Sequence, residues 1–509
     1  MNTTLPSSSR RRDGPPLPAR AKRWLYLIHR WAGIVLCLFF AMWFISGVVM
    51  MYVGYPKLTP QERLAHLPAL DSAAITITPA QALAAAGVQD SAGMILAAAR
   101  GGAPVYLVPG EARRAPKVVD AASGVLLPSA DAATALATAR AWSGGQYTVR
   151  YQGTVEEDAY THSRALGPDR PLHRVDLDDP AQTRLYISSA TGMVVLDATR
   201  AERVWNYAGA WIHWLYPFRG NALDGWWHDI VVWLSVAGVL LALTGTVVGI
   251  LRWRFSRPYA SGSRSPYREN MMRWHHLSGL LFAAITITWI FSGLMSMNPW
   301  KVFASGAPPL AQAAYAGKPG TTLAPPRDLI AALPAPPREL RWARADGHDV
   351  VLARSAAGAP GVLSARDARP HAYDPAALRA AAARLVPGAR LARIETLDAY
   401  DFYYYARDEH AMLGHVEKPL PAWRLIYDDP HSTWVYLDPR TGQILSRQDS
   451  GSRASRWLFA FLHSWDWTGL LSRRPLWDAL LVFLSLGGAA LSLTGAVIGW
   501  RRLGRKLRA

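Results

Sequence analysis

Long apolar runs alternate with mixed polar sequence along the 509-residue chain. Each of the four longest runs reaches the length that an α-helix needs to cross the hydrocarbon core of a bilayer, about 20 residues. The stretches between them contain short alternating segments and turn pairs such as Thr191-Gly192, which indicate β-strands. The pattern therefore predicts an α-helical membrane protein with four transmembrane helices and two soluble α+β domains.

The predicted boundaries follow the ends of the apolar runs. Trp and Tyr residues gather in two short segments beside the membrane helices, where they suit the headgroup region of a bilayer. In chain order we predict a disordered tail (1–22), transmembrane helix 1 (23–53), soluble domain 1 (54–204), an interfacial segment (205–224), helix 2 (225–252), a loop (253–272), helix 3 (273–298), soluble domain 2 (299–456), a second interfacial segment (457–475), helix 4 (476–501) and a tail (502–509).

The second half of the chain repeats the first. Residues 273–297 repeat the pattern within residues 23–52 at an offset of 246, and residues 461–503 match residues 211–253 at an offset of 250. Self-similarity at a long period indicates two copies of one structural unit, here helix–domain–helix. Because each copy crosses the membrane twice, both copies begin on the same side. We therefore predict two pseudo-symmetric repeats related by an axis along the membrane normal.

Four histidines occupy matched positions in this repeat. His29 corresponds to His275, which we name the inner pair, and His213 corresponds to His463, which we name the outer pair. An ionisable residue within a membrane helix is costly and is by default a candidate functional residue. The repeat axis would bring each pair to equal depth, where two neutral imidazoles can bind one haem iron from both sides. An iron with both axial positions filled favours electron transfer.

One helix face follows each inner histidine. Residues three, four and seven positions apart lie on the same side of a helix, and a glycine one turn after a histidine lets a flat ring approach the backbone. The tryptophans lie about 21 Å further along the helix, where they either contact a haem or pack within the bundle. The matched residues are Gly33 and Trp43 after His29, and Gly279 and Trp289 after His275. Repeated Ser-Gly and Thr-Gly pairs in the same helices read as close helix contacts.

Two further histidines remain open as ligands. His276 is adjacent to His275 and points about 100° away on the helix, so it is either the true ligand or a partner of a haem propionate. His228 corresponds to Asp478 in the second copy, which makes it a reserve outer ligand. The simple alternative for any one of these histidines is a polar side chain that reaches the membrane surface.

The distribution of the net charge of +18 predicts how the chain is oriented in the membrane. Lys and Arg cluster in residues 1–30, 252–273 and 501–508, which flank the apolar runs. Short basic segments of this kind mark the cytoplasmic side of a membrane. We therefore predict a multi-pass protein with both termini in the cytoplasm and both soluble domains outside it. The basic charge does not indicate nucleic-acid binding.

The absence of several sequence motifs limits which cofactors the chain can bind. Cys37 is the only cysteine, and no C-x-x-C-H motif occurs, so any haem is held without covalent bonds, as haem b, and two are expected. No G-x-G-x-x-G follows a strand, and no P-loop occurs, so the chain shows no nicotinamide, flavin or ATP site. Electrons must come from a quinol or from a cytoplasmic reductase.

Several motifs resemble those of PepSY-associated transmembrane proteins over residues 23–503. These motifs are H-R-W-A-G and H-H-L-S-G with a later S-G, W-I-H-W and L-H-S-W, and D-x-Y-x-x-x-R before hairpins such as V-Y-L-D-P-R-T-G. The resemblance implies periplasmic PepSY domains and a bacterial inner-membrane location. It also implies two b-type haems and release of iron from ferric siderophores. Carried over by position, the haem histidines are His29, His213, His275 or His276, and His463.

We therefore expect an oxidoreductase, a membrane cytochrome that passes electrons outward to a ferric siderophore. Reduction to Fe(II) weakens binding by hard oxygen ligands and frees the metal. One alternative is a non-enzymatic periplasmic PepSY module that binds or inhibits other proteins. Another is a haem subunit that relays electrons to a different periplasmic enzyme. A colourless purified protein favours the non-enzymatic module.

Overall fold

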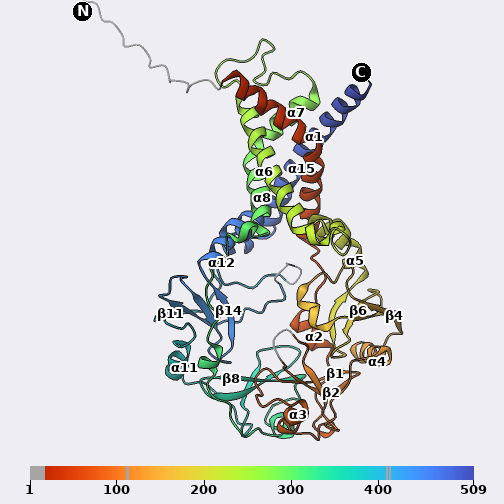
Figure 1. The fold of residues 1–509 in the computed structure, drawn as a ribbon, viewed down its shortest axis with the longest axis vertical. Coiled ribbons are helices and arrows are strands. Elements are labelled where there is room, and N and C mark those ends of the chain that lie inside the picture. The colour runs from red at the N-terminus through yellow and green to blue at the C-terminus, as the bar shows by residue number, and fades with distance from the viewer. Residues whose placement is uncertain (1–17, 111–113, 409–410, 412–413, 509) are drawn as a thin grey trace, which may run out of the picture. The chain divides into compact units, whose positions relative to one another are not determined.

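The computed structural model describes residues 18–110, 114–408, 411 and 414–508, so most of the predicted N-terminal tail lies outside it. The chain forms two compact units (Figure 1). The helical unit comprises Met1–Ile45, Asp229–Met297 and Asp478–Ala509, and the β unit comprises Ser46–His228 and Asn298–Trp477.

Long apolar helices form the helical unit. Among the described residues, three helices are long and apolar enough to cross a membrane, and one bent pair would make a fourth span. The helices are α1 (Ala19–Met50), α6 (Trp227–Arg252), the pair α7 (Asn270–Leu281) and α8 (Ala283–Ser296), and α15 (Leu476–Leu507). The chain is thus a membrane-type protein. Two ends differ from the prediction, because α1 begins inside the expected disordered tail and α15 continues to Leu507.

The third predicted span is broken. We expected one helix over 273–298, but α7 and α8 meet at Phe282 with a bend of 69°. The Phe282 ring lies where a Cβ atom on Gly487 of α15 would be, and the Phe44 ring lies in the same way on Gly488. A glycine pair has no side chains to hold two rings away from the backbone. The break therefore coincides with close packing of Phe282 against α15.

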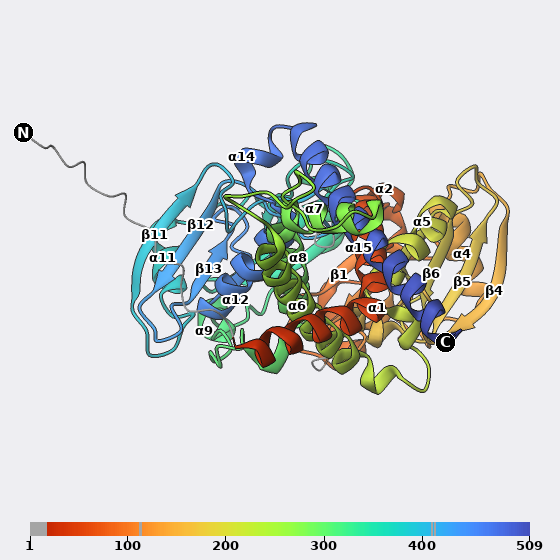
Figure 2. The ribbon, with the colours of Figure 1, turned by 90° about the horizontal axis from the view of Figure 1, so that it is seen from above.

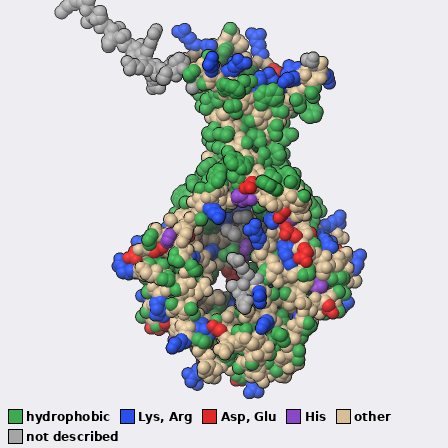
Figure 3. Space-filling view, viewed as in Figure 1, with side chains coloured by type: hydrophobic (Ala, Val, Ile, Leu, Met, Phe, Trp, Pro, Cys, Tyr) green, Lys and Arg blue, Asp and Glu red, His purple; other side chains and the backbone are tan. Residues whose placement is uncertain are grey.

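The helical unit has a small interior and an apolar exterior. Its core joins all four spans through Leu36, Phe40, Phe44, Leu241, Ile290 and Ala489. Large apolar side chains such as Leu38, Leu281 and Leu486 are exposed, as expected of residues that face lipid. Figure 3 shows these apolar side chains around the helices, with Lys and Arg side chains gathered at the end where α1 begins.

The β unit contains one sheet to which both predicted soluble domains contribute. Its strand order is β10-β9-β8-β1-β2-β3, and β1 pairs antiparallel with β8 through Ile95 opposite Arg341. The strands are β1 (Ile95–Arg100), β2 (Ala103–Val108), β3 (Lys117–Asp120), β8 (Glu339–Ala345), β9 (His348–Arg354) and β10 (Gly361–Ser364). Residues 54–204 and 299–456 are therefore joined by backbone hydrogen bonds, which the prediction of two domains did not anticipate.

Two four-stranded antiparallel sheets lie on opposite sides of the β unit (Figure 2). One helix packs on each sheet and buries an alanine- and leucine-rich face against it. The first contains β4 (Val149–Val155), β5 (Leu172–Leu177), β6 (Arg184–Ser188) and β7 (Val194–Ala198) with α4 (Ala132–Trp142); the second contains β11 (Leu391–Leu397), β12 (Ala422–Tyr427), β13 (Trp434–Leu437) and β14 (Ile444–Gln448) with α11 (Pro375–Ala382).

Short helices connect these sheets and are defined by local caps. In α2 and α5 the first-turn glutamate and the N-cap threonine bond each other's backbone N–H groups, which satisfies donors that a helix start leaves open. The remaining short helices are α2 (Pro60–His66), α3 (Pro79–Ala86), α5 (Arg200–Asn206), α9 (Gln312–Ala316), α10 (Pro326–Ala331), α12 (Ser450–Ser455), α13 (Leu462–Ser464) and α14 (Thr468–Leu471).

The same turn precedes β6 and β13. The Asp179 carboxylate accepts the Thr183 backbone N–H at 2.6 Å, and Asp429 accepts that of Thr433 at 2.6 Å. Between them Gln182 and Ser432 have φ angles of 49° and 50°. Polar side chains that bond to the backbone two to four residues on stabilise such turns. These residues belong to the two aspartate-rich stretches that match in the sequence.

A buried ion pair crosses the central sheet. Glu339 of β8 is fully buried, and its carboxylate lies 2.5 Å from Arg63 Nη2 of α2 and 3.7 Å from Arg341 Nε. A buried carboxylate is costly unless it is paired, so this contact favours one register between the two halves of the sheet. Next to it, Trp342 and Tyr106 are almost completely buried in a shared core.

Asp197 at the end of β7 should make the stability of the β unit pH-dependent. Burial, followed by the negative charges of Glu62 and Glu202, raises the pKa of Asp197 to about 7. Because this folded pKa lies above that of an unfolded aspartate, about 3.9, protonated Asp197 stabilises the fold. That contribution is complete below about pH 4 and is lost as the pH rises through about 7.

We therefore expect Asp197→Asn to raise the urea midpoint at pH 8 and to flatten its decline between pH 5 and pH 8. Asp178→Asn is the control, because the Asp178 side chain is exposed. An unchanged pH profile in the Asp197→Asn variant contradicts this assignment.

Candidate functional site

The inner pair meets within the helical unit. His29 of α1 and His275 of α7 have ring centroids 6.4 Å apart and planes inclined by 31°. A metal–imidazole bond is about 2.0 Å long, and a five-membered ring with bonds of about 1.33 Å has its centre roughly 1.1 Å from each atom. Two rings on opposite sides of one metal therefore have centroids about 6.3 Å apart. The separation in the inner pair equals that expected for two axial ligands.

Helix α15 orients the His275 ring. His275 Nδ1 lies 3.1 Å from the carbonyl oxygen of Leu491 and 3.2 Å from Thr494 Oγ1. The Thr494 hydroxyl donates to the carbonyls of Ala490 and Leu491, so its oxygen is an acceptor for His275. Both partners therefore favour a proton on Nδ1, which leaves the lone pair on Nε2 for a metal.

Helix α6 supports the His29 ring in the corresponding way. The backbone of Leu241, which the repeat matches with Leu491, faces the ring. His29 Nδ1 is nevertheless buried without a hydrogen bond of normal geometry to any described residue. A Cβ atom on Gly245 would lie 2.6 Å from His29 Cε1, and one on the matched Gly495 would lie 3.1 Å from His275 Cε1.

The glycines beneath the rings therefore come from the Thr-Gly pairs. The sequence predicts those pairs as close helix contacts, and it predicts Gly33 and Gly279 as the positions where a flat haem ring can approach the backbone. A Cβ atom on Gly33 would meet Leu241 Cδ1 at 3.8 Å, and one on Gly279 would meet Leu491 Cδ1 at 3.4 Å. Within the described residues, Gly33 and Gly279 thus face leucine side chains.

This difference predicts contrasting effects for two alanine substitutions. Gly245→Ala should displace the His29 ring and destabilise the helical unit by about 1–3 kcal/mol, the usual cost of overpacking. Gly33→Ala should have little effect, because its neighbours lie at ordinary contact distance. Thermal unfolding of the purified protein in detergent compares the two. Equal midpoints for both variants contradict the assignment of Gly245.

His276 is held away from the inner pair. Its Nδ1 atom bonds Ser265 Oγ at 2.8 Å, and its Nε2 atom bonds the carbonyl oxygen of Gly249 at 2.9 Å. The ring also meets Trp253 and Tyr267 edge to face. His276 thus ties the 253–272 loop to α6: Nε2 donates to the Gly249 carbonyl, and the lone pair on Nδ1 accepts from the Ser265 hydroxyl.

The outer pair meets within the β unit. The His213 and His463 ring centroids are 6.1 Å apart, close to the axial-ligand separation derived above, and the planes are inclined by 77°. Each ring is half-buried. Phe459 packs beside His463 at a centroid distance of 5.6 Å. The geometry again suits two ligands of one metal.

Matched turns present the two outer histidines. A π-helical segment precedes each one, and π-helical turns are frequent at functional sites. Two residues after each histidine the chain turns through a left-handed residue, Leu215 in the first copy and Trp465 in the second. Trp227 Nε1 donates to the Trp214 carbonyl at 2.8 Å, and Trp477 Nε1 donates to the Ser464 carbonyl at 3.0 Å. These bonds hold both turns in the same way.

The C-terminal end of α1 supports His213. Ser46 is almost completely buried, and its Oγ atom lies 2.9 Å from His213 Nδ1. A Cβ atom on Gly47 would lie 3.7 Å from His213 Cε1. When the hydroxyl accepts a proton from Nδ1, Nε2 is left with the lone pair for a metal. His228, the reserve outer ligand, is exposed at the start of α6.

Buried polar atoms without hydrogen-bond partners lie along α1 and α8. Among the described residues of the helical unit, Tyr26 Oη, Arg30 Nε, Thr286 Oγ1 and Trp289 Nε1 are buried and unbonded. Buried polar groups normally have partners, so each of these atoms is a candidate ligand contact. Tyr26 and Arg30 flank His29, where they suit the carboxylates of a bound cofactor.

The predicted tryptophans lie in the helical core. Trp43 packs against Phe40 at 6.3 Å between ring centroids, and Trp289 packs against Phe44 at 5.8 Å. The described residues contain no group of three or more His, Cys, Asp or Glu side chains that could hold a metal ion. Two histidines at axial separation suit an iron whose other four positions are occupied by a porphyrin. Haem therefore fits both pairs.

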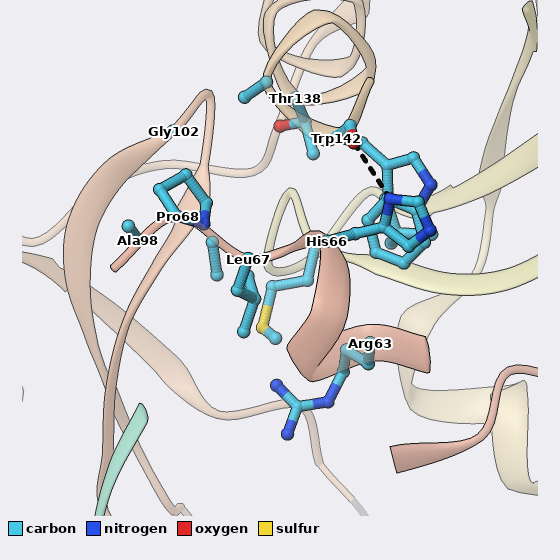
Figure 4. A pocket seen from close by; sticks show the side chains of 12 residues that line it. Arg63, His66, Leu67, Pro68, Ala98, Gly102, Thr138 and Trp142 are labelled. Atoms are coloured by element: carbon cyan, nitrogen blue, oxygen red, sulfur yellow. Dashed lines mark hydrogen bonds between the residues drawn. The ribbon is translucent and has the colours of Figure 1, made fainter. Parts of the chain in front are cut away.

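One enclosed pocket lies in the β unit (Figure 4). The His66 ring stacks on Trp142 at 4.3 Å, and His66 Nδ1 bonds the Trp142 carbonyl at 3.1 Å. The cavity volume is about 20 Å³, which admits a single water molecule. This pocket is too small for a porphyrin or an iron chelate.

Comparison with known proteins identifies the family alone. No curated protein matches the chain. The family described as "PepSY-associated TM region" matches residues 26–502, which is nearly the whole chain and includes all four histidines of the two pairs. The protein therefore belongs to the PepSY-associated transmembrane family.

Proposed function

We propose that the protein is a di-haem b-type cytochrome of the bacterial inner membrane that reduces ferric siderophores in the periplasm. The observation that carries this proposal is the pair of centroid separations, 6.4 Å for His29–His275 and 6.1 Å for His213–His463. Each haem iron, when bound, supplies reversible one-electron transfer. In each pair the two histidines would together hold the haem, so a ferric chelate would receive its electron without binding to the haem iron.

The residues around each pair have defined roles in this proposal. Leu491 and Thr494 hold His275 with Nε2 toward the iron, and Ser46 does the same for His213. Tyr26 and Arg30 are buried donors for a haem carboxylate beside His29. About 25 Å of continuous helix α1 separates His29 from Ser46, so the two pairs serve two haems.

The proposed orientation follows from charge. The end of the helical unit where α1 begins is rich in Lys and Arg, as cytoplasmic ends of membrane helices are (Figure 3). Both termini would then be cytoplasmic and the β unit periplasmic. Reporter fusions after residue 130 and after residue 508 should report opposite sides; the same side for both contradicts this orientation.

The substrate proposal rests on redox chemistry. One electron from the protein converts Fe(III) to Fe(II), which oxygen-rich siderophores bind more weakly, and the iron is released. Electrons are supplied by a quinol or by a cytoplasmic reductase. Figure 3 shows a hollow in the β unit with both Lys and Arg and Asp and Glu side chains around it.

Anaerobic mixing tests the proposal. Chemically reduced protein, freed of excess reductant, is mixed with several ferric siderophores in the presence of a ferrous chelator. We expect the protein to reoxidise and the chelator to trap one Fe(II) for each haem that is oxidised. Protein that stays reduced for hours with every ferric siderophore contradicts the reductase function and favours a subunit that relays electrons to another enzyme.

A further inference from the structure

His275 of the inner pair and His213 of the outer pair differ in what accepts the Nδ1 proton. In the inner pair, His275 faces the carbonyl oxygen of Leu491, a strong acceptor, at 3.1 Å, together with Thr494 Oγ1 at 3.2 Å. In the outer pair, His213 faces the Ser46 hydroxyl at 2.9 Å. A hydroxyl oxygen accepts a hydrogen bond less strongly than a backbone carbonyl or a carboxylate.

The acceptor at Nδ1 influences the metal through the ring. A stronger acceptor draws the proton from Nδ1 and makes Nε2 a better electron donor. A better donor stabilises Fe(III) over Fe(II) and lowers the reduction potential of a haem iron. A hydroxyl partner therefore leaves the potential higher than a carbonyl partner does, when all else is equal.

The position of Ser46 makes this contact effective. Ser46 is about 1% exposed, so bulk water does not compete for the bond, and a buried hydrogen bond is stronger electrostatically than an exposed one. Gly47 leaves the adjacent surface of α1 open to the His213 ring, at 3.7 Å from a virtual Cβ atom. Ser46 and Gly47 of α1 thus both lie against the His213 ring.

We propose that Ser46 is a positioning residue for His213 that accepts its Nδ1 proton, directs Nε2 to the outer iron and lowers the potential of the outer haem less than a backbone carbonyl acceptor would. The inference rests on the proposed function, because it requires haem at the outer pair. A higher outer potential favours electron movement from the inner haem toward the periplasmic substrate. The effect of Ser46 is therefore measured by substitution and not by comparing the potentials of the two haems.

Potentiometric titration of the full-length haem-loaded protein in detergent measures both haems by their absorbance. Ser46→Ala removes the acceptor, so we expect the outer haem potential to rise and the inner one to stay. A threefold change in the ratio of reduced to oxidised outer haem at fixed potential corresponds to about 28 mV, at 59 mV per tenfold for one electron. Ser46→Thr keeps a hydroxyl and should restore the wild-type value.

Two further variants separate tuning from packing. Ser46→Cys keeps the size of the side chain but offers a weak acceptor, so it should shift the outer potential in the same direction as Ser46→Ala. Gly47→Ala adds a methyl group at ordinary contact distance and should leave both potentials unchanged. Loss of the outer haem in Ser46→Ala, with recovery in Ser46→Thr, also supports the positioning role.

The outcomes distinguish this inference from the proposed function. Two haems with unchanged potentials in Ser46→Ala and Ser46→Cys overturn the role of Ser46 and leave the cytochrome intact. A shift confined to the inner haem, or a fall in the outer potential, overturns it as well. Wild-type protein without haem overturns the proposed function itself.

Discussion

Replacing His29 by alanine should remove about one haem per chain and leave the second haem in place. The His29 and His275 rings lie at the separation expected of two ligands on one metal. Loss of one axial ligand leaves an iron held by a single imidazole, and loss of one ligand from a two-ligand site removes most of its affinity. His275→Ala should have the same effect, because the two side chains act as one site.

His276→Ala is the matched control for this experiment. It removes the adjacent histidine, whose two nitrogens are bonded to Ser265 and Gly249. We expect full haem content and a destabilisation of about 1–3 kcal/mol from the lost buried hydrogen bonds. The haem-to-protein ratio and the low-spin spectrum of each variant are the measurements. Full haem content in His29→Ala, or loss of one haem in His276→Ala, contradicts the assignment of the inner pair.

Replacing His463 by alanine should slow electron delivery to a ferric siderophore to a small fraction of the wild-type rate. His463 is paired with His213 at 6.1 Å within the β unit, so its loss disrupts the outer site. The inner pair lies in the helical unit and keeps all of its own contacts. The variant should therefore still bind one haem and still accept an electron from a chemical reductant.

Stopped-flow reoxidation of the reduced variant separates these steps. Reoxidation of the variant by the ferric siderophore should be slow, whereas reduction of its remaining haem by a chemical reductant should proceed as in the wild type. His228→Ala provides the control, since His228 is exposed and lies outside the pair. A wild-type reoxidation rate in His463→Ala contradicts exit through the outer pair, and a slow rate in His228→Ala assigns the outer ligand to His228.

The histidine partners could be predicted from sequence because each pair is matched at a constant offset. Helical periodicity assigns His29 to a face of its helix, but it does not determine the distance to a second helix. The 6.4 Å separation depends on Gly245 and Gly495, which bring neighbouring helices against the two rings. These glycines were visible as repeated Thr-Gly pairs, and only the packing revealed which surface they meet.

Two residues that contact the histidine rings also belong to repeated pairs in the sequence. Ser46 and Thr494 belong to repeated Ser-Gly and Thr-Gly pairs, and in the structure both contact histidine Nδ1 atoms. A short polar residue in an apolar helix has two ordinary uses, a bond to its own helix backbone or a bond to a neighbour. The sequence cannot choose between them. A useful indication would have been their constant spacing from the matched histidines.

The shared central sheet had no local indication in the sequence. Alternating segments in both soluble blocks predict strands, but the pairing of β1 with β8 joins residues about half the chain apart. Such pairing depends on which edges remain free after the nearer strands have paired. The bend at Phe282 was missed for a related reason, because it coincides with the contact to Gly487 in a distant helix.

We infer that the two histidine pairs hold two haems. A reduced-minus-oxidised absorbance spectrum and a haem count on the purified full-length protein test this inference. We predict two non-covalent b-type haems per chain, both low-spin in the oxidised and the reduced state. A colourless protein, or a spectrum of high-spin iron with an open axial position, contradicts the account.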